Sequence, residues 1–378
     1  MNMGNIPFLR ASVVPVNEYL DEVEKIDISH IYTNYGPLNQ HFEEAIMSEF
    51  FKSRGAVTTV ANATLGLMAA IQLKKRKKGK YALMPSFTFP ATALAAIWCG
   101  LEPYFIDISL DDWCMDKTVL VDKINELKEE VAVVVPYATF GSWMDLKEYE
   151  KLEKQGIPVV VDAAPGFGLM HGDMHYGQDF SGMIVYSFHA TKPFGIGEGG
   201  MIYSYNEEEI NRIKRMGNFG FDKNRECKMM GFNCKMSEYA AAIGIATINK
   251  WDQKVHERNR IADWYKQLLQ STGLMKKGWK VQKTEAVIHQ FMPILSPEKI
   301  HNTQVIEALK KQKIEARLYF SPACHQQDFL KNYKSTDLTR TNKIAKRIVS
   351  LPLWEGMTKE MVEQIVMCLA QKVVSTDE

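Results

Sequence analysis

The chain has 378 residues, of which 46% are hydrophobic and 24% are charged. That composition is ordinary for a soluble globular protein, and the length suits two domains better than one small core. The formal net charge of +1 gives no electrostatic reason to expect nucleic acid or an anionic membrane as a partner.

Membrane and secretory features are also missing from the sequence pattern. No apolar run approaches the ~20 residues that span a bilayer, and the N-terminal segment MNMGNIPFLRASVVP does not read as a signal peptide. The six cysteines have neither the spacing of a disulfide framework nor that of a zinc site. We therefore expect a cytoplasmic protein without a bound metal.

Short β-rich runs alternate with helical patterns through the first two thirds of the chain. Near-continuous apolar strands separated by helices predict a largely parallel sheet covered on both faces. Helical spacing of apolar residues predicts helices near 38–50, 64–73, 91–98, 117–129 and 145–154. The strands are expected at 56–60, 81–85, 103–108, 131–137, 157–162, 183–188 and 199–205.

The C-terminal third has a different pattern. Residues 206–216 are expected to be helical, and a long polar-faced helix is expected over about 236–270. The rest alternates strand, helix, strand and helix, which suits a smaller α+β domain. We expect a large domain over 1–255 and this smaller domain over 256–378.

Polar residues follow several of the expected strands. In open α/β sheets, ligands bind beyond the carboxyl ends of the strands. Asp162, Ser187 and Lys192 fall at or just beyond such ends, and the segment Asn62-Ala63-Thr64 lies between a strand and a helix start. We expect these residues to meet in one crevice.

Lys192 lies in the segment SFHATKPFGIGEGG, just past a buried strand and ahead of four glycines. A lysine nucleophile works only where its amine can lose a proton and reach a carbonyl group. The glycines would let the backbone approach a flat ligand closely. Taken alone, the segment is equally compatible with a lysine in a tight turn between two strands.

Asp162 ends the apolar run IPVVVD, where an unpaired carboxylate would be costly to bury. The ring nitrogen of pyridoxal 5′-phosphate (PLP) would be a suitable partner, since it must stay protonated for the ring to act as an electron sink. The alternative is an aspartate that caps a helix or a turn.

The phosphate and the ring of such a cofactor also have candidate ligands. The helix start at Ala63 and Thr64 could bind an anion through backbone N–H groups, with hydroxyl groups from Thr64 and Ser187. Plain helix capping is the alternative. Phe89 offers a flat surface for a ring, although it could equally be a core residue.

The order of these segments is what resembles a known family. The chain resembles the DegT (DegT/StrS) family of nucleotide-sugar aminotransferases, which are PLP-dependent transferases of fold type I. The resemblance implies a large domain with a mostly parallel seven-stranded sheet and a smaller C-terminal α+β domain. The matching segments are TNYGP, PSFTFPAT, VVDAAPGFG, SFHATKPFGIGEGG, GFNCKMSEYAAAIG, ARLYFSPACHQ and SLPLWEGMT.

The resemblance also implies roles for individual residues. Lys192 would hold PLP covalently and Asp162 would face its ring nitrogen, which makes these two the catalytic residues. Asn233 would reach the phosphate from the neighbouring subunit, so that a homodimer shares its active sites. The remaining cofactor ligands would be Ala63, Thr64, Phe89 and Ser187, and the residues near the substrate Tyr35, His189, Tyr319 and His325.

Two positions depart from the family pattern. Asn62-Ala63-Thr64 stands where the family usually has Ser-Gly-Thr, which keeps the N–H donors and loses the glycine. Pro165 stands where a His or Gln usually contacts the phenolic oxygen of the cofactor, and proline has no such donor. The resemblance therefore leaves open what contacts that oxygen.

For function, the resemblance implies transfer of an amino group from L-glutamate to a nucleotide-linked keto sugar. His189-Ala190 before the lysine and Glu198-Gly199-Gly200 after it look like the subgroup that aminates carbon 4. We therefore expect dTDP-4-keto-6-deoxyglucose to become dTDP-4-amino-4,6-dideoxyglucose, in O-antigen or other lipopolysaccharide synthesis.

Several alternatives stay open. The substrate could be a UDP-4-keto sugar or a 3-keto sugar, and the protein could be a non-catalytic PLP-binding regulator. The sugar dehydratases of the family carry histidine at the lysine position, so Lys192 argues against that activity.

Overall fold

The computed structural model describes residues 5–373. At its centre, a four-stranded sheet in the order β1-β9-β8-β5 and a three-stranded sheet in the order β3-β2-β4 meet edge to edge. Parallel bridges from Val134 to Val159 and from Tyr137 to Asp162 join β4 to β5, so the two sheets make up the predicted seven strands. The strands are β1 (Ala56–Val60), β2 (Tyr81–Pro85), β3 (Glu102–Ile106), β4 (Val131–Val134), β5 (Val160–Asp162), β8 (Met183–Ser187) and β9 (Gly200–Ser204).

The central sheet is mostly parallel, as predicted. Strand β9 is the exception, because it runs antiparallel to both of its neighbours, β1 and β8. The pairs β2–β3, β2–β4 and β5–β8 are all parallel. The carboxyl ends of most strands therefore lie along one edge of the sheet.

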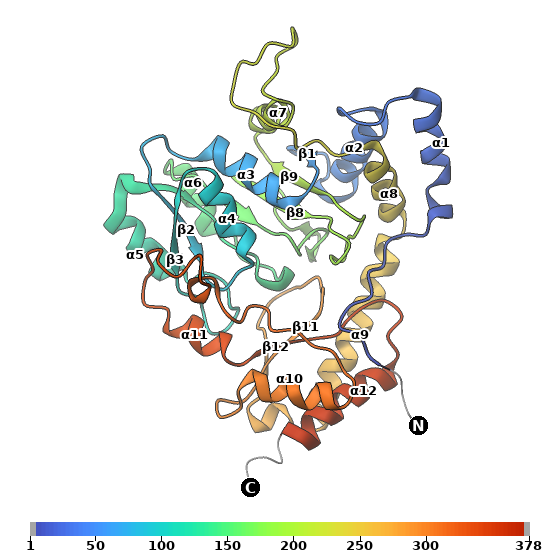
Figure 1. Ribbon diagram of the computed structural model, residues 1–378, viewed down its shortest axis with the longest axis vertical. Coiled ribbons are helices and arrows are strands. Elements are labelled where there is room, and N and C mark those ends of the chain that lie inside the picture. Colours follow the sequence, from blue (N-terminus) through green and yellow to red (C-terminus); the bar gives the residue numbers. More distant parts are fainter. Residues whose placement is uncertain (1–4, 374–378) are drawn as a thin grey trace.

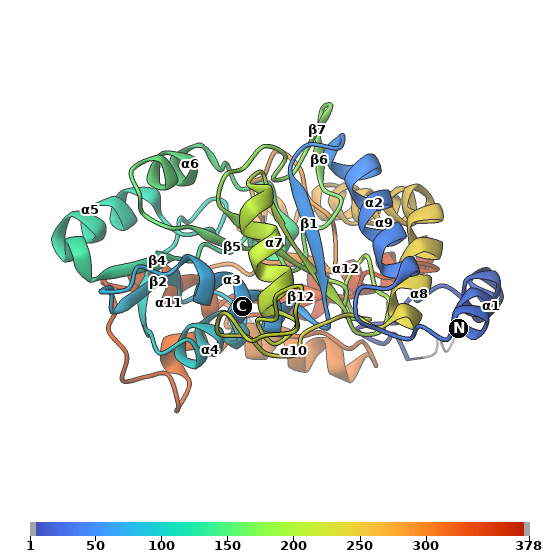
Figure 2. The same ribbon diagram turned by 90° about the horizontal axis from the view of Figure 1, so that it is seen from above.

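Helices cover both faces of this sheet (Figure 2). Side chains alternate along each strand, so Ile184 and Met201 join the hydrophobic cluster on one face, and Val185 and Ile202 join the cluster on the other. The first face carries α2 (Pro37–Phe51), α5 (Lys117–Leu127), α6 (Lys147–Lys154) and α8 (Glu238–Asn249), and the second carries α3 (Ala63–Lys74), α4 (Pro90–Trp98) and α7 (Glu207–Met216).

The predicted long helix over 236–270 is two helices. Helix α8 ends at Asn249 and α9 (Trp251–Ser271) begins after Lys250, whose φ of −106° and ψ of 1° leave the helical region. The side chain of Trp251 packs against Phe50 and Phe194. No Gly or Pro marks this break, so the apolar periodicity of the sequence continues through it. What distinguishes the break is the packing of Trp251 against residues distant in the sequence.

The C-terminal part forms its own small sheet (Figure 1). Strands β10, β11 and β12 pair antiparallel, and helices α9, α10 and α12 pack with them in one hydrophobic cluster. Ile6 joins this cluster and pairs with Ile314, so the N-terminal segment packs here as well. The boundary near residue 255 stays a prediction. The elements are β10 (Lys280–Val281), β11 (Met292–Leu295), α10 (Asn302–Lys311), β12 (Ile348–Leu351) and α12 (Lys359–Cys368).

A few elements lie outside these layers. Helix α1 contacts α8, and β6 and β7 form a small hairpin. Within residues 5–373, none of the helices has the length and apolarity that crossing a membrane requires. The bounds are α1 (Leu20–Ser29), α11 (Thr339–Ala345), β6 (Met170–His171) and β7 (Met174–His175).

Candidate active site

A cavity of about 680 Å³ opens beyond the carboxyl ends of β5 and β8. Segments from the central sheet form one side of it, and Gln290, Phe291, Tyr319 and Phe320 from the C-terminal part form the other. The predicted site residues that line it are Ala63, Thr64, Phe89, Asp162, Ser187, His189, Lys192 and Tyr319.

Asp162 is the last residue of β5 and is almost completely buried. Its Oδ2 accepts a hydrogen bond from Thr92 Oγ1 at 2.7 Å, and its Oδ1 accepts one from the N–H of Ala164 at 3.1 Å. Burial raises the pKa of Asp162, although both hydrogen bonds and the charge of Lys192 oppose this. The chain therefore does not place enough positive charge near this carboxylate to offset the cost of its burial.

Lys192 follows β8 and lines the cavity with its side chain half-buried. Burial lowers its pKa to about 8, although the charge of Asp162 favours the protonated amine. Its Nζ donates a hydrogen bond to Oε1 of Gln290 at 3.3 Å. Near pH 8 a large share of this amine is neutral, which is the form that attacks carbonyl carbon.

The start of α3 also lines the cavity. Asn62 caps the helix by accepting from the N–H of Leu65 at 3.0 Å, and the first N–H groups of a helix have no partner within it. A Cβ on Gly200 would lie 2.9 Å from the N of Ala63, so only glycine lets β9 approach this helix start. Hydroxyl groups of Thr64 and Ser187 also line the cavity. This arrangement suits an anion.

Aromatic side chains also line the cavity. Phe89 precedes α4 and leaves 55% of its surface exposed, whereas Phe320 is buried with its ring centroid 6.5 Å from that of Phe89. Tyr137 and Phe291 line the same cavity. A planar ring can therefore lie against Phe89.

These features fit PLP. The under-compensated carboxylate of Asp162 suits a protonated ring nitrogen, the start of α3 suits the phosphate group, and the amine of Lys192 suits the aldehyde. The carboxylate, the amine and the helix N–H groups that fit PLP all belong to this one chain.

Three predicted residues lie outside the cavity of the single chain. His325 bonds Ser86 Oγ through Nδ1 at 2.6 Å and Asn342 through Nε2 at 3.1 Å. Tyr35 donates from its hydroxyl group to the carbonyl of Lys214 at 3.0 Å. Asn233 accepts from Lys235 Nζ at 2.7 Å. Their roles toward substrate or a second subunit stay predictions.

Some residues of the cavity were not predicted. Tyr137 and Gln290 line it, and Thr92 donates a hydrogen bond to Asp162. The segment PSFTFPAT contains Thr92, so the signal for that residue was present, whereas nothing in the sequence near Gln290 indicates a site. Ala164, not Pro165, is among the lining residues.

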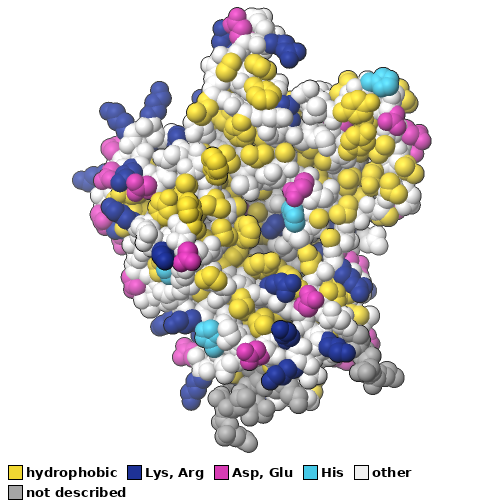
Figure 3. All heavy atoms as spheres, in the orientation of Figure 1, with side chains coloured by type: hydrophobic (Ala, Val, Ile, Leu, Met, Phe, Trp, Pro, Cys, Tyr) yellow, Lys and Arg dark blue, Asp and Glu magenta, His cyan; other side chains and the backbone are white. Residues whose placement is uncertain are grey.

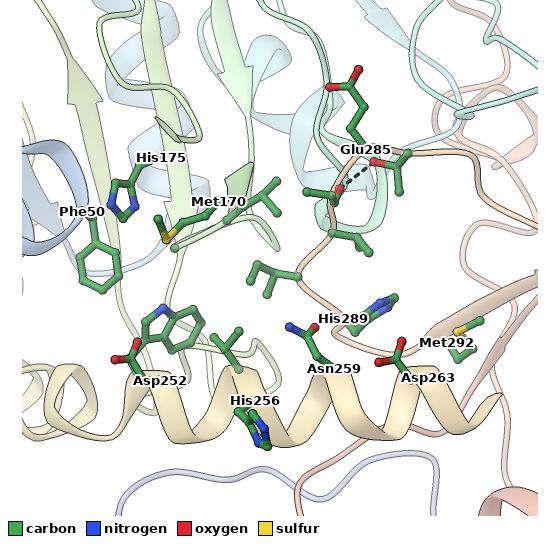
Figure 4. A pocket seen from close by; sticks show the side chains of 18 of the residues that line it. Phe50, Met170, His175, Asp252, His256, Asn259, Asp263, Glu285, His289 and Met292 are labelled. Carbon is green, nitrogen blue, oxygen red and sulfur yellow. Dashed lines mark hydrogen bonds between the residues drawn. The ribbon is translucent and has the colours of Figure 1, made fainter. Parts of the chain in front are cut away.

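A second cavity of about 930 Å³ lies between α9, the β6–β7 hairpin and residues 281–293. Figure 4 shows Asn259 and Asp263 on one helix beneath His289. None of the predicted site residues lines this cavity.

The mixed, mostly parallel sheet, with this lysine and aspartate at the carboxyl edge of its strands, defines the class as a PLP-dependent transferase of fold type I. The sequence profile of the DegT/DnrJ/EryC1/StrS aminotransferase family matches residues 15–370. The chain belongs to this family, and it is a PLP-dependent sugar aminotransferase.

Known relatives agree with this assignment. A crystal structure from Bacillus cereus ATCC 10987, described provisionally as a PLP-dependent aminotransferase, is 84% identical, covers 97% of this chain and 100% of its own, and has a TM-score of 0.97. The structure of DesI with its TDP-sugar product is 26% identical over 97% of this chain and 93% of its own, with a TM-score of 0.86. The Escherichia coli dTDP-4-amino-4,6-dideoxy-D-glucose transaminase is 28% identical over 99% of this chain and 100% of its own.

Proposed function

We propose that this protein transfers the amino group of L-glutamate to carbon 4 of dTDP-4-keto-6-deoxyglucose and produces dTDP-4-amino-4,6-dideoxyglucose. The observation that carries the proposal is the meeting of Lys192, Asp162 and the start of α3 in one cavity. The E. coli relative named for this amino sugar and DesI with its TDP-sugar product support the choice of substrate. A role in O-antigen or other lipopolysaccharide synthesis in the cytoplasm is part of the proposal.

The proposed chemistry assigns different roles to Lys192 and Asp162. PLP, when bound, supplies an electron sink for the carbon that loses or gains a proton. Lys192 is the general base and acid that moves this proton, because its lowered pKa lets the amine both accept and release it near neutral pH. Asp162 would hold a positive charge on the ring nitrogen of bound PLP, and Thr92 and Ala164 orient its carboxylate.

The mouth of the cavity has groups that suit a polar sugar. His189 Nε2 lies 3.5 Å from a carboxylate oxygen of Glu198, and its Nδ1 bonds the hydroxyl group of Thr191 at 2.8 Å. These groups flank Lys192, so they can orient sugar hydroxyl groups and decide which carbon reaches the cofactor. Tyr319 lines the same cavity and is proposed to contact the substrate.

A homodimer with shared active sites is the second part of the proposal. On the face shown in Figure 3, hydrophobic side chains extend from the middle of the molecule to the region of α1 and α8. Leu20 and Ile28 of α1, Tyr32, Tyr239 of α8 and Met230 are all exposed in the single chain. Exposed apolar side chains in such number suit an interface with a second copy.

The test is product analysis with a panel of keto sugars. Purified protein, PLP and L-glutamate are incubated with dTDP-4-keto-6-deoxyglucose, a UDP-4-keto sugar or a 3-keto sugar, and the product is examined by proton NMR. We expect turnover with the first substrate and an equatorial amine on carbon 4. An amine on carbon 3, or preference for the UDP sugar, would replace the proposed substrate, and absence of turnover with every sugar would favour a regulatory protein.

A further inference from the structure

The chain passes between the two cavities just before β11. The side chain of His289 lines the cavity of about 930 Å³ (Figure 4). The side chain of the next residue, Gln290, lines the cavity of about 680 Å³ that contains Lys192 and Asp162, called the cofactor cavity from here on. Gln290 therefore reaches Lys192 from the C-terminal part of the protein.

The hydrogen bonds of Gln290 fix which way its amide group points. Its Nε2 donates to the backbone carbonyl of Thr191 at 3.0 Å, and its Oε1 accepts from Nζ of Lys192 at 3.3 Å. The reverse orientation would place the amide oxygen against a carbonyl oxygen, which has no hydrogen to donate. The acceptor must therefore face the lysine.

A buried ion network holds the backbone at this point. Arg258 Nη1 donates to the carbonyl oxygens of His289 at 2.8 Å and of Gln290 at 3.4 Å. Arg258 Nε in turn donates to Glu355 at 2.6 Å, and Lys254 Nζ lies 3.3 Å from the same carboxylate. The position of Gln290 is thus fixed from both its side chain and its backbone.

We propose that Gln290 is a positioning residue that holds the amine of Lys192 whenever that amine is not attached to the cofactor. The inference rests on the role proposed above for Lys192. A free lysine side chain has several rotatable bonds, and proton transfer needs its amine in one place. Oε1 of Gln290 supplies that place from a rigid backbone.

The neutral amide also matters for the charge of Lys192. A carboxylate at 3.3 Å would favour the protonated amine and raise its pKa, whereas an amide oxygen accepts the hydrogen bond without a full charge. Gln290 can therefore orient the amine while burial keeps the pKa low.

The test measures Lys192 in the cofactor-free protein. The rate of modification of Lys192 by trinitrobenzenesulfonate is followed against pH by mass spectrometry of its peptide, in wild type, Gln290→Glu and Gln290→Leu. We expect a midpoint near pH 8 in wild type and a midpoint at least about one unit higher in Gln290→Glu. Gln253→Glu, at an exposed position of α9, is the matched control and should leave the midpoint unchanged.

The second measurement is proton transfer in the PLP-loaded protein. With L-glutamate alone, Gln290→Leu should slow loss of the α-proton about tenfold or more with little change in the KM for glutamate. A wild-type midpoint in Gln290→Glu, or a wild-type rate in Gln290→Leu, would overturn the inference. If Gln290→Glu does not fold, the rate of Gln290→Leu decides. Neither measurement uses a sugar, so the result does not depend on the proposed substrate. The role of Lys192 is tested separately: if borohydride reduction attached PLP to another lysine, the proposed role of Lys192 would be rejected.

Discussion

Burial and charge act against each other at Asp162 and Lys192. Each charge favours the ionised form of the other residue, yet burial raises the pKa of Asp162 and lowers the pKa of Lys192. Burial is therefore the larger effect on both groups, and the chain alone does not compensate it. A bound ring with a protonated nitrogen beside Asp162 would add the missing positive charge and leave Lys192 free to lose its proton.

The first prediction concerns Asp162. Changing Asp162→Asn keeps the shape of the side chain but replaces one of its two accepting oxygens by a donor. It also removes the charge that is proposed to keep the ring nitrogen protonated. We expect the rate of α-proton loss from glutamate to fall at least ~100-fold, measured in single turnover with PLP bound. Asp145→Asn, at an exposed aspartate, is the control. A near wild-type rate in Asp162→Asn would mean that this carboxylate does not face the ring.

Among single residues, the sequence predicts the site residues that lie at the ends of strands. Asp162, Ser187 and Lys192 each end or follow an apolar run, and the cavity brings them together as predicted. Gln290 lies 98 residues from Lys192, in a segment with no turn signal or charge. Only the packing of the C-terminal part against the central sheet makes it a neighbour, so local pattern could not find it.

At the scale of elements, α9 connects the small sheet to the candidate site. Lys254 and Arg258 lie one turn apart on α9, and both contact Glu355, which follows β12. All three side chains are at most 9% exposed. Burial alone would raise the pKa of Glu355, but Arg258 and Lys254 more than offset it and lower that pKa. One carboxylate thus fixes α9, β12 and the segment that carries Gln290.

The second prediction is that Glu355→Gln destabilises the fold. Two buried cations would lose their charged partner, which should lower the free energy of unfolding by about 3 kcal/mol, measured by denaturant unfolding of the PLP-free protein at neutral pH. Glu363→Gln, which removes an exposed pair with Lys359 at 3.9 Å, should change it by less than about 0.5 kcal/mol. Equal effects of the two changes would contradict the structural role of Glu355.

The pH dependence follows from the same network. Because the pKa of Glu355 is lower in the folded protein than its ordinary value of 4.5, its stabilisation is complete above that value. It is lost as the pH falls through the lower folded pKa. Glu355→Gln should therefore lose more stability relative to wild type at pH 7 than at strongly acidic pH.

Element positions were mostly predictable, and the exception is informative. Every strand of the central sheet overlaps a predicted one, because buried parallel strands are continuous apolar runs. The break at Lys250 was missed. Neither proline nor glycine marks it, and its cause lies in the contacts of Trp251 with residues distant in sequence.

At the scale of the whole molecule, an aromatic cluster joins the central sheet to the C-terminal part. Phe87, Tyr137 and Phe140 from the first part pack with Phe291 and Phe320 from the second. Tyr137, Phe291 and Phe320 also line the cofactor cavity. The aromatic cluster that joins the two parts therefore also forms a wall of the site. No single segment of the sequence predicts this wall, because its residues come from both parts of the chain.

The last prediction is that two chains build each site. Asn233 lies between α7 and α8 and does not line the cavity of its own chain, so any contact with a phosphate group must be made in a second copy. We expect a dimer in sedimentation, and Asn233→Ala should retain PLP about tenfold less well, since a hydrogen bond to a charged group is lost. Asn224→Ala, at an exposed position of the same loop, is the control.

Mixed dimers test whether Asn233 acts across the interface. In a heterodimer of Lys192→Ala and Asn233→Ala chains, the site that uses Lys192 of the second chain receives an unchanged Asn233 from the first. If Asn233 acts on the partner's cofactor, that site is wild type, and half of the sites should bind PLP with wild-type affinity. If Asn233 acts within its own chain, every site lacks one of the two residues and no recovery occurs. An active monomer would contradict the shared site outright.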